Sequence, residues 1–226
     1  MGSIPLKRVK GISKASVILI GATALMSFAE LAARQAVTDE ADDYLAGVTD
    51  SDEFTESIIG YATVGLVTGL LTIAAAVVTI IWMFRIAANH RALHRGGTWG
   101  PGWAIGGWFL PPLIYVIPTL MLREMWKASD PDVPVGSDWR RSRGSPLPIV
   151  WFVLYTVVPF ISFAPEAGGM LDEINGSERT IAERITGDQT ADIVVAVFTV
   201  AAAVVFIMLV RQLTERHRRL TGEATR

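Results

Sequence analysis

The chain has 226 residues, of which 51% are hydrophobic, and its mean hydropathy is +0.40. This apolar content exceeds that of an ordinary soluble domain and favours one membrane domain over residues 1–226. The 20 basic residues are divided among several loops and form no single continuous patch, which argues against a nucleic-acid partner. The absence of cysteine excludes disulfides and thiolate metal sites.

The first apolar stretch, about residues 15–34, is long enough to cross a bilayer. Glu30 stands where a signal peptide would have small residues for cleavage, so we predict a retained transmembrane helix. Because Glu30 and Arg34 are spaced i, i+4, we expect them to neutralise each other near the outer interface. Four basic residues precede this stretch: Lys7, Arg8, Lys10 and Lys14.

The second apolar stretch, about residues 57–86, exceeds the roughly 20 residues that span hydrocarbon. It follows an acidic segment, residues 36–56, which contains no Lys or Arg and is predicted to be an outer loop. Gly65 and Gly69 form a small-xxx-small pair. We interpret the pair as helix packing within the chain, with dimerisation as the alternative.

Two later spans are predicted at about residues 147–164 and 191–211. The acidic segment between them, residues 166–190, is predicted to be a second outer loop. Within it, residues 180–185 favour a short helix with Ile181 and Ile185 on one face.

Residues 101–122 are apolar enough to span, but basic residues flank them on both sides. A true crossing would place the acidic 166–190 segment in the cytoplasm, against the charge bias. Prolines at 111, 112 and 118 also disfavour a continuous helix. The pattern predicts a hairpin that re-enters from the cytoplasmic side; an interfacial helix pair and a true crossing remain as alternatives.

These features predict an all-α integral membrane protein with four transmembrane helices plus a Trp/Pro-rich re-entrant or interfacial helical hairpin. The clusters of Lys and Arg place both termini in the cytoplasm, so the expected location is the plasma membrane.

Trp82, Arg85 and Asn89 share one helical face at the end of the second span. Such residues can form an interfacial aromatic belt, or a cluster that binds a headgroup, an anion or a partner. The candidate site comprises Trp82, Arg85, Asn89, Trp103, Trp108, Pro111, Pro112, Pro118 and Trp126.

His90 and His94 are one helical turn apart, but no third ligand is evident, so no metal or cofactor is expected. No nucleophile–base motif or phosphate loop occurs in the sequence, so an enzyme is not expected.

Three blocks carry a resemblance to a known family: IWMFRIAANHRAL, GPGWAIGGWFLPPLIYVIP and LREMWKASDP. Their order resembles a bacterial membrane family called domain of unknown function 4328. The matching positions are Trp82, Arg85, Asn89, Pro101, Trp103, Ala104, Trp108, Pro111, Pro118, Trp126, Ser129, Asp130 and Pro131. The resemblance implies the architecture and the location of the cluster, but no reaction.

We therefore expect a non-enzymatic multi-pass membrane protein whose cytoplasmic-side Trp/Arg/Asn cluster binds a lipid headgroup or a partner protein. Membrane lipids are the expected partners, with a membrane protein or a second copy of the chain as possibilities. The alternative is a small-solute or ion transporter or channel subunit, with the proline-broken hairpin as its gate.

Overall fold

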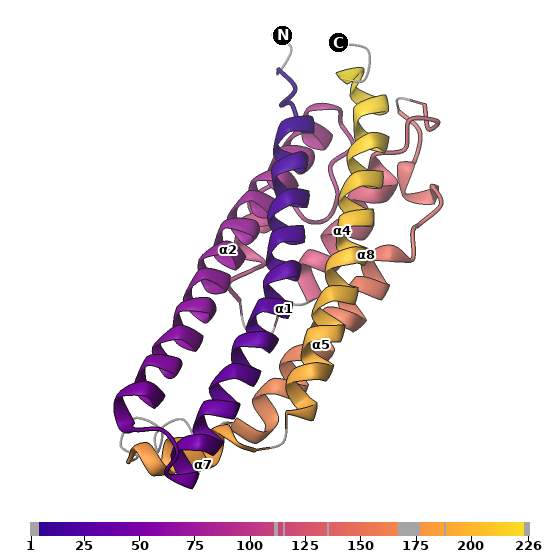
Figure 1. The fold of residues 1–226 in the computed structure, drawn as a ribbon. Helices are drawn as coiled ribbons and strands as arrows, with labels where there is room; N and C mark the ends of the chain where they lie inside the picture. Colours follow the sequence, from indigo (N-terminus) through magenta and orange to yellow (C-terminus); the bar gives the residue numbers. More distant parts are fainter. Residues whose placement is uncertain are drawn as a thin grey trace. The chain divides into compact units, whose positions relative to one another are not determined.

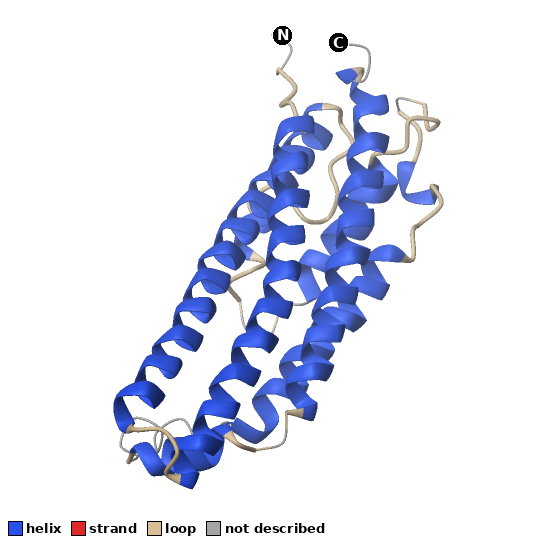
Figure 2. Ribbon diagram, viewed as in Figure 1, coloured by secondary structure: helices blue, strands red, loops and turns tan. Residues whose placement is uncertain are grey.

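The computed structural model describes residues 5–110, 113–114, 116–134, 136–166, 177–187 and 189–223, with side chains 157–166 outside the description. These residues form seven α-helices and one 3-10 helix and contain no strand, which confirms the all-helical prediction (Figure 2).

The chain divides into two compact units. Unit 1 comprises Met1–Gly21, Ile73–Val153 and Ala202–Arg226, and unit 2 comprises Ala22–Thr72 and Leu154–Ala201. Four long helices contribute residues to both units: α1 (Lys10–Ala46), α2 (Ser51–Ala92), α5 (Leu147–Glu166) and α8 (Thr190–Thr221) (Figure 1).

The division into units coincides with the segregation of charge. Unit 1 holds 17 of the 20 basic residues and 6 acidic residues, a net charge of +11. Unit 2 holds 16 of the 22 acidic residues and 3 basic residues, a net charge of −13. The basic and acidic clusters of the sequence therefore belong to separate compact parts of the fold.

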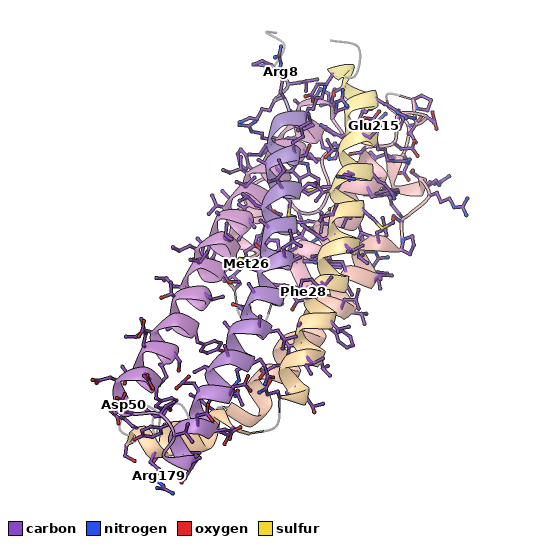
Figure 3. The ribbon with its side chains drawn as sticks, viewed as in Figure 1. Arg8, Met26, Phe28, Asp50, Arg179 and Glu215 are labelled. Carbon is purple, nitrogen blue, oxygen red and sulfur yellow. The ribbon has the colours of Figure 1, made fainter. Side chains whose placement is uncertain are left out.

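Within the described residues, α1, α2 and α8 are long and apolar enough to cross a membrane. They contain the predicted spans at 15–34, 57–86 and 191–211. Many of their large aliphatic and aromatic side chains are exposed, including Phe28 on α1 (Figure 3) and Leu66 on α2. Such a surface suits contact with lipid rather than water.

Unit 2 contains a small core at the ends of α1 and α2. Phe54 and Ala41 are fully buried there, and the Phe54 ring stacks on Tyr44 with centroids 4.9 Å apart. Helix α7 (Glu178–Ile185) packs Ile181 and Ile185 against this core, as the predicted short helix requires.

This core corrects the prediction of an outer loop over residues 36–56. Residues 36–46 continue α1 and residues 51–56 begin α2, leaving only a short turn between them. A helix that projects beyond hydrocarbon keeps its carboxylates in water while one face packs on a neighbour. Of the second predicted outer loop, residues 167–176 and 188 lie outside the described residues.

The turn between α1 and α2 has recognisable caps. Gly47 has a φ of +73°, and the Val48 N–H donates to the Asp43 carbonyl at 2.9 Å, which closes α1 in a Schellman motif. Asp50 then caps α2, because its Oδ1 accepts from the N–H groups of Asp52 and Glu53 at 3.0 Å each.

Unit 1 contains the tryptophan- and proline-rich segment. It forms α3 (Trp103–Gly106) and α4 (Val116–Ala128), followed by η1 (Trp139–Arg141). The two helices approach at Gly107, where an added Cβ would come within 2.6 Å of Ile117 Cγ2. Residues 111, 112 and 115 lie outside the described residues.

Candidate functional site

An amide side chain near the end of α2 fixes the start of the chain. Buried Asn89 accepts the Lys7 N–H through Oδ1 at 2.7 Å and donates from Nδ2 to the Lys7 carbonyl at 2.8 Å. These bonds define the amide orientation, because a backbone N–H only donates and a carbonyl only accepts. The backbone at Lys7 is thereby held against α2.

The second amide hydrogen of Asn89 begins a directional chain of hydrogen bonds. Asn89 Nδ2 lies 3.0 Å from His217 Nε2, which must accept because the amide nitrogen is a donor. Neutral His217 therefore carries its proton on Nδ1, 3.3 Å from Ser129 Oγ. The Ser129 hydroxyl is left to donate to His90 Nε2 at 3.0 Å. This buried chain joins α2, the end of α4 and α8.

Trp82 makes a parallel connection from α2 to α8. Its ring is fully buried, and its Nε1–H donates to Thr214 Oγ1 at 3.0 Å. Trp82 and Asn89 lie two turns apart on α2, and their partners Thr214 and His217 lie one turn apart on α8. The predicted Trp82–Asn89 face therefore packs inside unit 1, and neither side chain is exposed as a belt residue would be.

Buried Arg95 closes the end of α4. Its guanidinium donates to the carbonyls of Ala128 at 3.2 Å and Asp130 at 2.6 Å, and also to that of Val133. These oxygens lie at and just beyond the helix C-terminus, where unpaired carbonyls favour a cation. A second contact lies nearby in sequence: the Trp99 N–H, before α3, donates to Oε2 of Glu124 on α4 at 3.3 Å. The residues before α3 and after α4 are therefore in direct contact.

Arg216 on α8 binds the last turn of α4 and the residues that follow it. It forms an ion pair with Asp130 Oδ2 at 2.5 Å, and its Nε donates to the Trp126 carbonyl at 3.2 Å. Its guanidinium also lies 5.5 Å from the centre of the Trp126 ring. Ser142 completes the group by donating to Asp130 Oδ2 and accepting from Arg216.

The carboxyl group of Asp130 has a lowered pKa. Burial alone would raise it, but hydrogen bonds from the Ser142 hydroxyl and the Asp132 N–H, with the charges of Arg216 and Arg95, outweigh that effect. The folded state therefore favours the ionised carboxylate.

A strongly basic cavity of about 480 Å³ lies beside this network in unit 1. Leu6, Gly11 and Thr221 contribute to its lining. Glu223 is its one lining carboxylate among the described residues. Five cationic side chains line it: Lys7, Arg8, Lys10, Arg85 and Arg218. Figure 3 labels Arg8 next to the first turn of α1.

The cationic cavity has walls fixed by backbone contacts. Glu223 accepts the N–H groups of Val9 and Lys10 at 3.1–3.2 Å, at the N-terminus of α1. Arg85 uses one Nη1–H to bind the Arg8 carbonyl at 3.0 Å. A guanidinium has five N–H donors, so Arg85 retains donors for an anion in the cavity.

The other predicted site residues lie along α3 and α4. Trp103 is partly exposed, and Trp108 packs against Trp151 with ring centroids 6.3 Å apart. Pro118 is buried in the first turn of α4, where a missing N–H costs no helical hydrogen bond, so it is compatible with this helix. Pro111 and Pro112 lie outside the described residues.

The two histidines considered as ligands have separate roles. His90 belongs to the hydrogen-bond chain, whereas His94 has a φ of +55° and caps α2. In that cap, the Arg95 N–H donates to the His90 carbonyl at 2.7 Å. Within the described part of the chain, no group of three or more His, Asp and Glu side chains is placed to hold a metal.

The structure thus brings Trp82, Asn89 and Trp126 into one network in unit 1 and places Arg85 in the adjoining cavity. Sequence reasoning missed His217, Arg95 and Arg216 as members. Their basic side chains offered a signal only through the charge clusters, which do not specify partners.

Gly65 and Gly69 are separate from this network and belong to unit 2. A Cβ added to either would meet no described atom within 4 Å, so no helix of the described chain packs closely against them.

No curated protein and no solved structure matches the chain significantly. A family model does match residues 47–215, three quarters of the sequence. This range contains the signature residues of the network, from Trp82 to Asp130. The chain therefore belongs to the family described as domain of unknown function (DUF4328).

Proposed function

We propose that the protein is a non-enzymatic multi-pass membrane protein that binds the phosphate headgroup of an anionic lipid in the cationic cavity. The observation that carries this proposal is the gathering of five cationic side chains against one lining carboxylate, with Arg218 also paired to Glu215 at 2.9 Å. Each Lys or Arg near an anionic membrane surface contributes about 1 kcal/mol to attraction. A phosphate group can accept several of their N–H donors at once.

The buried network positions this cavity. Asn89 holds the backbone of Lys7, and Arg85 holds that of Arg8, so the cationic side chains extend from a fixed backbone. Preorganised donors lose less entropy when they bind an anion than donors on a mobile tail. Asn89 is therefore a positioning residue, and the arginine and lysine side chains make the contact.

An adjoining groove can accept the lipid chains. It has a volume of about 330 Å³ and continues along α1 and α8 from Lys10 and Arg218 to Val17, Ile18 and Val210. Its lining combines these three apolar side chains with further charged ones, Lys14, Arg211 and Glu215, so the acyl chains would contact Val17, Ile18 and Val210. A phospholipid could use both the cationic side chains and the apolar ones, whereas a free phosphate would use only the cationic side chains.

A catalytic role for the Ser129–His90–His217 group is disfavoured by burial. Ser129 and His217 have no exposed surface, and each is engaged by the other members of the hydrogen-bond chain. A nucleophile must reach its substrate. The arrangement instead suits a structural connection between helices.

We also propose four spans, with α5 as the third, and a hairpin that re-enters at residues 101–122. The 20 residues of α5 are enough to span hydrocarbon. The contacts of Arg95 with α4 and of Trp99 with Glu124 support a hairpin whose two ends lie on the same side. Exposed Ile105 and Phe109 would then contact lipid.

The basic charge of unit 1 supports a cytoplasmic location for both termini in the plasma membrane. Because the chain has no cysteine, single-cysteine labelling can test this topology. We expect Ser137→Cys, after the hairpin, and Arg219→Cys, near the C-terminus, to be labelled only in inside-out vesicles. Asp52→Cys should be labelled only in right-side-out vesicles. Labelling of Ser137→Cys together with Asp52→Cys would contradict re-entrance.

Headgroup binding can be measured by native mass spectrometry of the purified protein with phosphatidylglycerol and phosphatidylcholine. We expect preference for phosphatidylglycerol, and at least a tenfold rise in its Kd after Arg85→Ala, since about 1.4 kcal/mol of charge-assisted hydrogen bonding is lost. Arg218→Ala should act similarly.

Arg123→Ala is the matched control, because it removes an exposed arginine of unit 1 that lies on α4 and outside the cavity lining. Equal weakening by Arg123→Ala, or equal affinity for the two lipids, would contradict a specific headgroup site. Competition by inorganic phosphate without lipid retention would assign the cavity to a soluble anion instead.

A further inference from the structure

A second polar cavity, of about 340 Å³, lies within unit 2 among residues of α1, α2 and α8. Each helix contributes hydroxyl-bearing side chains to the lining, including Ser27, Thr68 and Thr199. Ser27 and Thr68 are buried. Three charged residues also line the cavity: Glu30, Arg34 and Asp192.

This cavity interrupts apolar sequence. Ser27 lies within the apolar stretch of α1, and Thr68 and Thr199 lie within those of α2 and α8. Leu25 and Phe28, beside Ser27, and Val67, beside Thr68, are exposed as lipid-facing residues would be. Polar and ionisable groups at such depth are costly and are usually retained for ion or substrate binding.

The charges of the lining leave one carboxylate uncompensated. The i, i+4 spacing predicts an ion pair between Arg34 and Glu30. Arg34 pairs with Asp192 instead, with its Nε 3.4 Å from Asp192 Oδ2. That ion pair has no net charge, so the lining as a whole carries a charge of −1. Among the described residues, Glu30 has no hydrogen-bond or ion-pair partner.

The hydroxyl groups on α2 are oriented as acceptors. Thr68 donates its hydroxyl hydrogen to the Val64 carbonyl at 3.1 Å, and Thr72 donates to the Thr68 carbonyl at 2.9 Å. Each hydroxyl oxygen keeps lone pairs after this donation. The lining therefore offers neutral oxygen atoms together with one carboxylate, Glu30, that has no cationic partner among the described residues.

We propose that this cavity binds one monovalent alkali cation, with Glu30 as the charged ligand and hydroxyl oxygens as neutral ligands. Hard cations prefer oxygen ligands, and one carboxylate balances a single positive charge. A divalent cation would remain half neutralised. The site shares no residue with the cationic cavity of unit 1, so cation binding and headgroup binding can be tested independently.

The test uses the 226-residue chain, purified in detergent in a buffer whose only cation is the organic ion N-methylglucamine. Titration with NaCl or KCl at constant ionic strength should raise Tm saturably by about 3–5 °C, because a ligand that binds only the folded state stabilises it. Binding of radioactive ²²Na⁺ in a scintillation proximity assay gives a second readout. No saturable rise with either ion would overturn the proposal.

Glu30→Gln should abolish the rise, whereas Glu56→Gln, a change at an exposed glutamate on α2 outside the lining, should retain it. If Glu30→Gln fails to fold, Thr68→Val provides the second test, because it removes an oxygen ligand but no charge. A cation affinity at least fivefold lower in Thr68→Val than in wild type supports the site. An undiminished response in Glu30→Gln, or a response to pH but not to alkali cations, would overturn the proposal.

Discussion

Replacing Arg216 with alanine is expected to lower the Tm of the purified protein by about 6–12 °C. Arg216 forms an ion pair with Asp130 at 2.5 Å, and the two side chains are only 24% and 12% exposed. Removing one partner leaves the other charge largely desolvated, at a cost of about 3 kcal/mol. For a chain of this length, each kcal/mol corresponds to roughly 2–4 °C. Tryptophan fluorescence during heating in detergent would measure the change.

Arg219→Ala is the control for this prediction. Arg219 also pairs with a carboxylate, Glu215, at 3.2 Å, but both side chains are well exposed. Exposed pairs contribute little, so the Tm should stay within about 2 °C of the wild-type value. A similar loss in both variants would contradict the special role of the Arg216–Asp130 pair.

The pH dependence of Asp130→Asn provides a further check on the same pair. Because folding lowers the Asp130 pKa below its ordinary value of 3.8, the carboxylate stabilises the fold above that pH. The contribution disappears as pH falls from 3.8 toward the folded-state pKa. Wild type should therefore be more stable than Asp130→Asn at neutral pH, and the difference should shrink below about pH 4.

The sequence was sufficient to predict features that depend on periodicity and charge. The i, i+7 spacing of Trp82 and Asn89 correctly placed both side chains on one face of α2. Ile181 and Ile185 likewise indicated the packed face of α7. These predictions needed only the geometry of a helix and the requirement to bury apolar groups.

The partners of those faces could not be predicted, because they come from distant parts of the sequence. Asn89 binds Lys7 and His217, which are 82 and 128 residues away along the chain. Arg34 similarly selects Asp192 over the nearby Glu30. Tertiary packing sets these contacts, and a local spacing rule cannot choose between alternative partners.

Acidic composition was a poor guide to the end of α1. The carboxylates of residues 36–46 suggested a solvated loop, but charged residues are tolerated on a helix that extends beyond hydrocarbon. Phe54 and Ala41 provide the packing that holds this extension, and their apolar character was the signal that the loop prediction overlooked. Pro118 was read as a helix breaker, whereas its position in a first turn makes it compatible with α4.

Asn89→Leu is expected both to lower Tm by about 6–12 °C and to weaken phosphatidylglycerol binding. Leucine has the same number and branching of side-chain heavy atoms but leaves the Lys7 N–H, the Lys7 carbonyl and His217 Nε2 without their partner. Loss of these three bonds costs about 3 kcal/mol in total, since Lys7 can regain water. The released N-terminal segment would no longer hold its cationic side chains in the cavity. Thermal unfolding and native mass spectrometry measure the two effects.

Two changes at Lys7 distinguish this backbone connection from a role of the lysine side chain. Lys7→Ala keeps both hydrogen bonds to Asn89, so its Tm should remain within about 2 °C of wild type. Lys7→Pro removes the N–H that Asn89 Oδ1 accepts and should reproduce part of the Asn89→Leu loss. If Lys7→Pro matched Lys7→Ala in stability, the Asn89 amide would not be what anchors the chain, and its role in shaping the cationic cavity would have to be abandoned.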